Sequence, residues 1–117
     1  MVLSESEREA FQDIRDNIAR ALRFVDGLDF DAFCADEKTF YAVARCAEIV
    51  EEAVGERLPP GFALPKIWKY DESPFWGVAH FTFHRLEHAA GLWRVIHELF
   101  PSLRAAIDAE LQTNPSE

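Results

Sequence analysis

Apolar residues recur every three or four positions along this chain of 117 residues, which is the spacing of one face of an α-helix. The first such set is Phe11, Ile14, Ile18, Leu22 and Val25. The second is Phe40, Val43, Ala47, Val50 and Val54, and the last is Trp93, Ile96, Phe100, Leu103 and Ile107. No segment shows the period-two alternation of a strand. The pattern predicts an all-α fold, an antiparallel bundle of four to five helices.

Capping residues indicate where the first two helices begin and end. Ser4 with Glu7 three residues later forms a capping-box pattern, and Gly27 can adopt the left-handed conformation that follows a helix. Asp36 is placed to cap the second helix, and the Pro-Pro-Gly run at 59–61 is expected to end it. These signals predict helices of about 20 residues each, which is long enough to bury one continuous apolar face.

The connecting segments carry weaker signals. Residues 29–35 are expected to form a short turn, and Ser73-Pro74 favours a short third helix over about 74–82. Pro101 lies inside the last apolar pattern, so we expect it to bend that helix or to split it. The chain is thus expected to form a single domain over 1–117, with a core of about 4–111 and a frayed tail.

Composition excludes several classes of protein. About half of the residues (49%) are apolar, which is enough for a core, and no run reaches the roughly 20 apolar residues of a membrane helix. The net charge of −9 disfavours DNA binding by bulk attraction but leaves room for a local RNA site. Acidic residues near position 5 occupy the place of a basic signal-peptide region, so we expect a cytoplasmic protein without membrane contact.

Cysteine and histidine side chains are the candidate metal ligands. Cys34 and Cys46 lack the CxxC spacing and are expected to be small apolar side chains in a reducing compartment. His80, His84 and His88 are spaced by four, with His97 further on, but no carboxylate completes a ligand motif. The prediction is therefore no metal and no cofactor, with a metal-binding bundle as the less favoured alternative.

Two surfaces admit both a structural and a functional interpretation. Arg45, Glu48 and Glu52 share one helix face, and Glu51 and Glu56 make the same helix more acidic. This pattern is typical of a solvated face, but it also fits a docking surface for a basic partner or the polar lining of a cleft.

A second surface is suggested by aromatic residues, which crowd the connection between helices. They are Trp68, Tyr70, Phe75, Trp76, Phe81 and Phe83, with Trp93 further on. They can cap one end of the core, form an interface with a partner chain, or stack on RNA bases. We favour the interface, because a small bundle cannot easily bury so many large rings.

Three stretches of the chain are similar to the HepT-like ribonuclease toxins of the HEPN superfamily, over roughly positions 10 to 108. They are GLDFDAFCADEKTFYAVARCAEIVEEAVGERLP, IWKYDESPFWGVAH and LWRVIHELFPSLRAAI. The most specific parts are ADEKT, the AxxRxxEIxxEA pattern of Ala42 to Ala53, the proline in the last helix, and the Trp68–His80 spacing. The resemblance implies an all-helical fold, usually a homodimer, paired with a small nucleotidyltransferase as antitoxin.

The resemblance also implies where a catalytic site would lie. The family motif is Arg, usually Asn, several residues, His, one residue and Tyr, and His80 matches its histidine. Phe75, Trp76 and Thr82 stand where the family has Arg, Asn and Tyr. In the family, cleavage needs no metal: the 2′-hydroxyl of RNA attacks its own phosphate, histidine moves the proton, and arginine stabilises the charge on phosphorus. Arg85, five residues after His80, is the candidate replacement for that arginine.

Two functions remain open at this stage. The chain is either a toxin-system component that keeps His80 as a general base for RNA cleavage, or a helical protein-binding module that has lost cleavage. In both, Trp68, Phe75, Trp76 and Thr82 are expected to lie at a partner interface.

Overall fold

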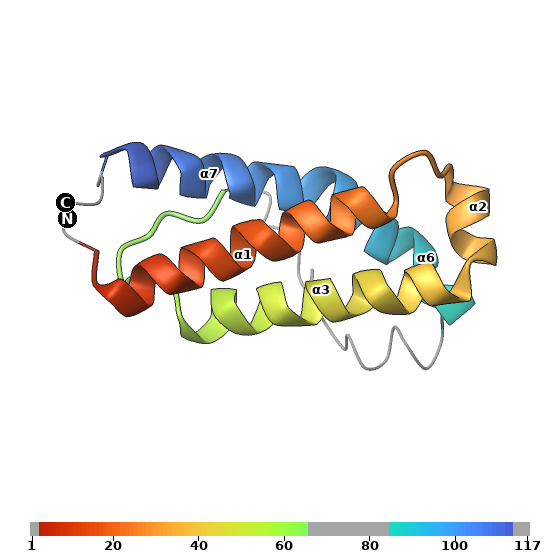
Figure 1. The fold of residues 1–117 in the computed structure, drawn as a ribbon, viewed down its shortest axis with the longest axis horizontal. Helices are drawn as coiled ribbons and strands as arrows, with labels where there is room; N and C mark the ends of the chain where they lie inside the picture. Colours follow the sequence, from red (N-terminus) through yellow and green to blue (C-terminus); the bar gives the residue numbers. More distant parts are fainter. Residues whose placement is uncertain (1–2, 66–84, 114–117) are drawn as a thin grey trace.

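The computed structural model describes residues 3–65 and 85–113, all of whose regular elements are helical. The elements are α1 (Glu5–Phe24), α2 (Phe30–Ala35), α3 (Glu37–Glu56), α6 (Arg85–Arg94), the π-helical turn η1 (Val95–Leu99) and α7 (Phe100–Thr113). In Figure 1, α1 runs antiparallel to both α3 and α7, and α2 lies across the far end of the bundle. The all-α bundle predicted from apolar spacing is confirmed.

The helix α1 begins where the capping box predicted. The backbone N–H of Ser4 donates to Oε1 of Glu7 at 2.8 Å, and the N–H of Glu7 donates to Oγ of Ser4 at 3.1 Å. Both bonds satisfy N–H groups that have no partner inside the helix. The helix ends at Phe24, and Gly27 follows with a φ of 80°, a left-handed conformation that glycine adopts without strain.

Residues 30–35 are helical, so the turn expected over 29–35 is wrong. Oδ1 of Asp29 accepts the N–H of Ala32 at 2.8 Å, which caps the first turn of α2. The fully buried ring of Phe33 lies 5.6 Å from Phe40 and 5.1 Å from Trp93. Because this one side chain packs on both α3 and α6, tertiary burial stabilises a helix that is too short to be stable alone.

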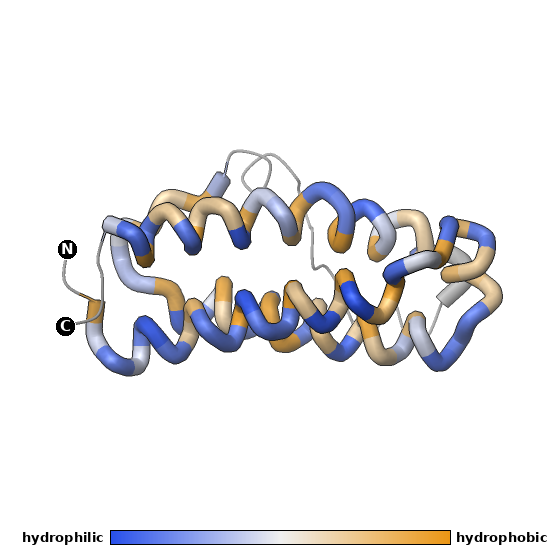
Figure 2. The backbone as a smooth tube through the Cα atoms, turned by 45° about the horizontal axis from the view of Figure 1, so that its top comes forward, coloured by the Kyte–Doolittle hydropathy of each residue, from blue (hydrophilic) through white to orange (hydrophobic). Residues whose placement is uncertain are grey.

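The core lies between α1, α3 and the C-terminal helices, and the apolar sets read from the sequence supply most of it. Figure 2 shows hydrophobic positions recurring along each helix with hydrophilic positions between them. Phe11, Phe40 and Phe100 are among the largest side chains with no exposed surface. The segment after α3 also contributes, since Phe62 packs its ring 5.3 Å from that of Phe11.

Pro101 does not split the last helical run, which instead changes helix type just before the proline. The run from Arg85 to Thr113 is continuous, but the N–H of Phe100 bonds to the carbonyl of Val95, five residues earlier. A proline at 101 has no N–H for the carbonyl of His97 and crowds it sterically, and a π-helical turn just before it shifts the hydrogen-bond register. On either side of this turn, α6 contacts α2 and α3, whereas α7 contacts α1.

Two ion pairs tie elements that are distant in sequence. Nη1 of Arg57 lies 2.8 Å from Oδ2 of Asp13, joining the end of α3 to α1. Nε of Arg15 lies 3.0 Å from Oδ1 of Asp108, joining α1 to α7. All four side chains are more than a third exposed, so solvent screening keeps each pair's stabilisation small. No helix in the described part of the chain is both long enough and apolar enough to cross a membrane.

Asp36 gives the start of α3 a testable dependence on pH. Its Oδ1 accepts the N–H of Thr39 at 3.0 Å, and its Oδ2 accepts the Thr39 hydroxyl at 2.7 Å. The backbone bond first, and then the hydroxyl bond, hold the pKa of this carboxyl below its ordinary value. Because the folded pKa is the lower one, this cap stabilises the fold above about pH 4 and is lost as pH falls through the folded pKa.

The variant Asp36→Asn is therefore expected to flatten part of the acid limb of the stability curve. Asparagine keeps a carbonyl oxygen for the Thr39 N–H but does not titrate. Urea unfolding between about pH 2 and pH 6 should show the free-energy difference between wild type and variant changing only below about pH 4. Parallel curves over the whole range would contradict the assignment.

Candidate functional site

Most residues of the ribonuclease-type site predicted from the sequence lie outside the described residues. These are Trp68, Phe75, Trp76, His80 and Thr82, together with His84 and the short helix expected over 74–82. Arg85 is the first residue of α6, and its side chain likewise lies outside the described part. Their roles stay predictions, and α6 is the described element that directly follows them in the chain.

The two described histidines do not share a surface. His88 is half-buried on α6, whereas His97 is exposed in η1, nine residues later and so about two and a half turns away. Within residues 3–65 and 85–113, no three His, Cys, Asp or Glu side chains gather as a metal site would require. The prediction of no metal still depends on His80 and His84, which are outside this part.

His97 has a defined orientation. Its Nδ1 lies 2.9 Å from the carbonyl oxygen of Trp93, and its ring centre lies 4.1 Å from that of Trp93. A carbonyl oxygen can only accept, so Nδ1 is the donor, and in the neutral ring Nε2 carries the lone pair. The bond fixes the tautomer of an exposed imidazole, but no other described group points to a reaction there.

Trp93 is the one member of the predicted aromatic cluster that is described. It is half-buried, and its ring lies 5.1 Å from Phe33 and 5.9 Å from Phe30 in an edge-on contact. For this residue the structure favours the core-capping alternative, because the ring joins α6 to α2. Phe30 at the rim stays 36% exposed.

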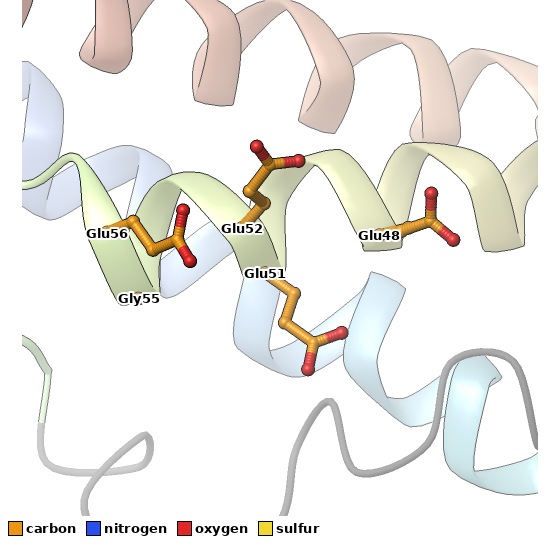
Figure 3. A pocket seen from close by; sticks show the side chains of 5 residues that line it. All are labelled: Glu48, Glu51, Glu52, Gly55 and Glu56. Carbon is orange, nitrogen blue, oxygen red and sulfur yellow. The ribbon is translucent and has the colours of Figure 1, made fainter.

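The acidic face of α3 is well defined (Figure 3). Arg45 and Glu48 form the ion pair that their spacing predicted. Four glutamates and a glycine line an open hollow of about 360 Å³: Glu48, Glu51, Glu52, Gly55 and Glu56. Glu51 and Glu52 point to opposite sides of the helix.

The environment of this hollow changes the acidity of one of its glutamates. Burial raises the pKa of Glu51, and the nearby charge of Glu48 raises it further. The local helix-supporting pair and the polar lining of a hollow, which the sequence left as alternatives, therefore occur on the same face.

The cysteines behave as expected of small apolar side chains. Cys46 is buried and Cys34 is half-buried, and neither forms a disulfide. Burial raises the pKa of the Cys46 thiol, against a smaller opposing effect of Arg20, Arg23 and Arg45. The thiol is therefore protonated near neutral pH, which removes it as a nucleophile.

Sequence reasoning missed a second open hollow, of about 380 Å³, between α1 and α7. It is lined by Arg15, Asp108, Leu111 and Gln112. Its two charged members pair with each other, as described above, so it offers no uncompensated charge to a ligand. Arg15 and Asp108 are 93 positions apart in the chain, and no local sequence motif predicts such a contact.

Comparison with known proteins gives one informative likeness. No family model and no solved structure matches the chain. A curated protein of Methanocaldococcus jannaschii named "Putative RNase MJ0127" is 31% identical over 100 residues, which take in 81% of this chain and 78% of the relative. The chain belongs to the same family. Since the match takes in most of both proteins, the relationship concerns the bundle as a whole. The relative's name agrees with the ribonuclease resemblance found in the sequence.

Proposed function

We propose that the chain is a HepT-like component of a nucleotidyltransferase-paired toxin–antitoxin system, a ribonuclease whose activity is strongly weakened. The observation that carries this proposal is the 31% identity, over most of the chain, to a protein named as an RNase. Two features of the sequence add to it: the retained His80, and the exchange of the neighbouring motif residues.

The proposed chemistry assigns His80 the role of general base. Its imidazole removes the proton of the RNA 2′-hydroxyl, and the resulting oxygen bonds to the adjacent phosphorus as the bond from phosphorus to the 5′-oxygen of the next nucleotide breaks. The leaving 5′-oxygen takes up a proton from water, and a 2′,3′-cyclic phosphate remains. Negative charge grows on the phosphoryl oxygens in the transition state. A cation held next to them lowers the barrier, because it is already oriented before the reaction begins.

Phe75 is the reason for proposing a weakened enzyme. It stands at the position of the family's arginine and can neither donate a hydrogen bond nor carry charge. Loss of one preorganised donor of this kind costs about 3 kcal/mol, or roughly a hundredfold in rate. Arg85 remains the candidate cation, either from the same chain or from a second copy.

A single-residue comparison tests the proposal. His80→Ala is expected to lower the slow cleavage of single-stranded RNA by the purified protein to the rate of a protein-free control. Metal chelator is kept in both reactions, because the proposed reaction needs no metal. Equal rates for wild type and variant would exclude the His80-dependent enzyme.

That negative result would favour the second candidate function, a non-catalytic helical module that keeps its partner surfaces. The exchange of three of the four motif positions supports it. The expected partner is the same in both cases, a small nucleotidyltransferase. Co-expression with a nucleotidyltransferase encoded next to the gene, followed by affinity capture through one partner, tests this pairing independently of RNA cleavage.

A further inference from the structure

A basic surface lies on this acidic chain where the C-terminal half of α1 runs beside the N-terminal half of α3 (Figure 1). On each helix its members are three or four residues apart, which places them on one side of that helix. Two of its members are among the three large hydrophobic side chains that are exposed in the described part of the chain. We call this surface the α1–α3 face, and its six exposed side chains are Arg20, Arg23, Phe24, Lys38, Tyr41 and Arg45.

The ion pair between Arg57 and Asp13 shows how the two helices are aligned. Phe24 lies eleven residues after Asp13, and Cys46 lies eleven residues before Arg57. Because the helices are antiparallel and rise equally per residue, Phe24 and Cys46 lie at the same level of the bundle. Burial raises the pKa of the Cys46 thiol and the three arginines of the face oppose that rise, so their charges lie around the same point.

Most of the positive charge of the face is not neutralised by a carboxylate. Nη1 of Arg20 donates to the neutral Oδ1 of Asn17 at 3.3 Å, and Arg23 lies over the ring of Phe24, 5.7 Å from its centre. Within residues 3–65 and 85–113, Arg20, Arg23 and Lys38 form no ion pair. These three cations are therefore available to an anionic ligand.

Acidic side chains limit the extent of the face. Arg45 pairs with Glu48, so it contributes less than the other three cations. Asp36 engages both of its carboxylate oxygens with Thr39. From Glu52 onward the surface of α3 is acidic. An anionic ligand is therefore attracted to the end of α3 that lies next to α2 and repelled from the other end.

Two aromatic rings distinguish the face from a simple cationic patch. Phe24 leaves 38% of its surface exposed, and Tyr41 leaves 44%. The ring of Tyr41 stands edge-on to the fully buried Phe40, with 6.0 Å between the ring centres. A ring that is already oriented loses little conformational freedom when a flat ligand stacks on it.

Cations beside exposed rings are the combination that binds single-stranded nucleic acid, because cations pair with phosphates and rings stack on unpaired bases. We propose that the α1–α3 face binds single-stranded RNA. The face includes none of the motif residues around His80. The choice of RNA as the ligand rests on the proposed function, whereas binding itself requires no catalytic residue.

Other ligands match only part of the face. A glutamate-rich peptide would pair with the cations but offers no flat groups to the rings. Duplex RNA has the phosphates, but its bases are already stacked on one another. An anionic lipid surface would be repelled by the net charge of −9 over the rest of the chain. Single-stranded RNA matches both the charges and the rings.

Fluorescence anisotropy with a labelled ten-nucleotide RNA tests the proposal. The probe carries 2′-O-methyl groups in place of the attacking hydroxyls, so binding is measured without cleavage. The wild-type chain should bind it with a dissociation constant of about 1–100 μM, the range of non-specific sites, and should bind the duplex of the same sequence more weakly.

Variants of the face should weaken binding in two distinguishable ways. Arg20→Gln and Arg23→Gln should each lower the affinity about threefold or more and reduce the slope of log K against log salt by about 0.7. Phe24→Ala and Tyr41→Ala should each lower it about fivefold or more without changing that slope. A merely structural role for these exposed residues would not separate the two effects.

Matched controls come from outside the face. Arg104→Gln makes the same charge change on α7, and Phe30→Ala removes the third exposed ring, which packs on Trp93 of α6 instead. Both variants should bind the probe as the wild type does. Circular dichroism checks that each variant is folded.

Three results would overturn the proposal: no binding by the wild type up to about 100 μM, face variants that bind as tightly as the wild type, or equal competition by a glutamate decamer. The binding and cleavage results are independent. Face variants that lose binding, while His80→Ala leaves cleavage unchanged, would support this proposal and exclude only the catalytic one. Cleavage that depends on His80, with normal binding by the face variants, would do the reverse.

Discussion

Replacing Phe75 with arginine is expected to raise the rate of RNA cleavage about a hundredfold over wild type. The change returns a positively charged, multiply donating group to the motif position five residues before His80. A guanidinium can bind two phosphoryl oxygens at once, and its charge is most useful when the transition state carries the most negative charge. Initial rates on a fluorescent single-stranded RNA, measured with chelator present, give the comparison.

Two controls separate this electrostatic effect from simple removal of apolar bulk. Phe75→Gln replaces the ring with a neutral polar side chain and should recover much less of the rate than arginine does. The double variant Phe75→Arg/His80→Ala should be as slow as His80→Ala alone, because arginine stabilises charge but cannot take up the 2′-hydroxyl proton. A Phe75→Arg protein no faster than wild type would mean that the missing arginine is not what limits cleavage.

A wild-type rate that already equals that of Phe75→Arg would point to Arg85 as a working replacement. In that case Arg85→Ala should slow the wild-type protein far more than it slows Phe75→Arg, because the restored arginine would take over the role. The pair of variants thus distinguishes a lost cation from a relocated one.

Much of the fold was predictable from local signals, because capping residues indicate where α1 and α3 begin and apolar spacing indicates which face of each helix is buried. The Ser4–Glu7 capping box and the Asp36 cap depend only on residues within one turn, and both form as predicted. The short helix α2 was missed because its stability depends on Phe33 packing against Phe40 and Trp93, which are contacts between three separate elements. Apolar periodicity does not reveal a six-residue helix, since a helix of that length contains fewer than two turns.

The segment around Pro101 likewise depends on contacts between elements that local sequence signals do not reveal. The sequence predicted that the helix would bend or split there, but not that a π-helical turn over Val95–Leu99 would keep the helical run continuous. The choice between these outcomes depends on packing, because α6 must reach α2 and α3 while α7 stays on α1.

For the candidate site, sequence similarity identifies one set of residues and the structure identifies another. Similarity to a known motif identifies His80 and its altered neighbours, whose chemistry follows from residue type alone. The hollow on α3 that Glu48, Glu51 and Glu52 line is known only from the structure, because an acidic helix face has the same sequence whether its surface is flat or hollowed.

The second large effect is expected in the core, where Phe40→Ala should lower the free energy of unfolding by about 3–5 kcal/mol. Phe40 has no exposed surface and packs its ring 5.6 Å from Phe33, so alanine leaves a cavity where α2 meets α3. Because the free energy of unfolding falls by about 1–3 kcal/mol per M urea, the urea midpoint should fall by about 1–5 M. Phe24→Ala, which removes the same ring from a site that is 38% exposed, should cost far less. Equal losses in the two variants would mean that the junction of α2 and α3 contributes nothing beyond ordinary surface burial, contrary to its role in holding α2 in place.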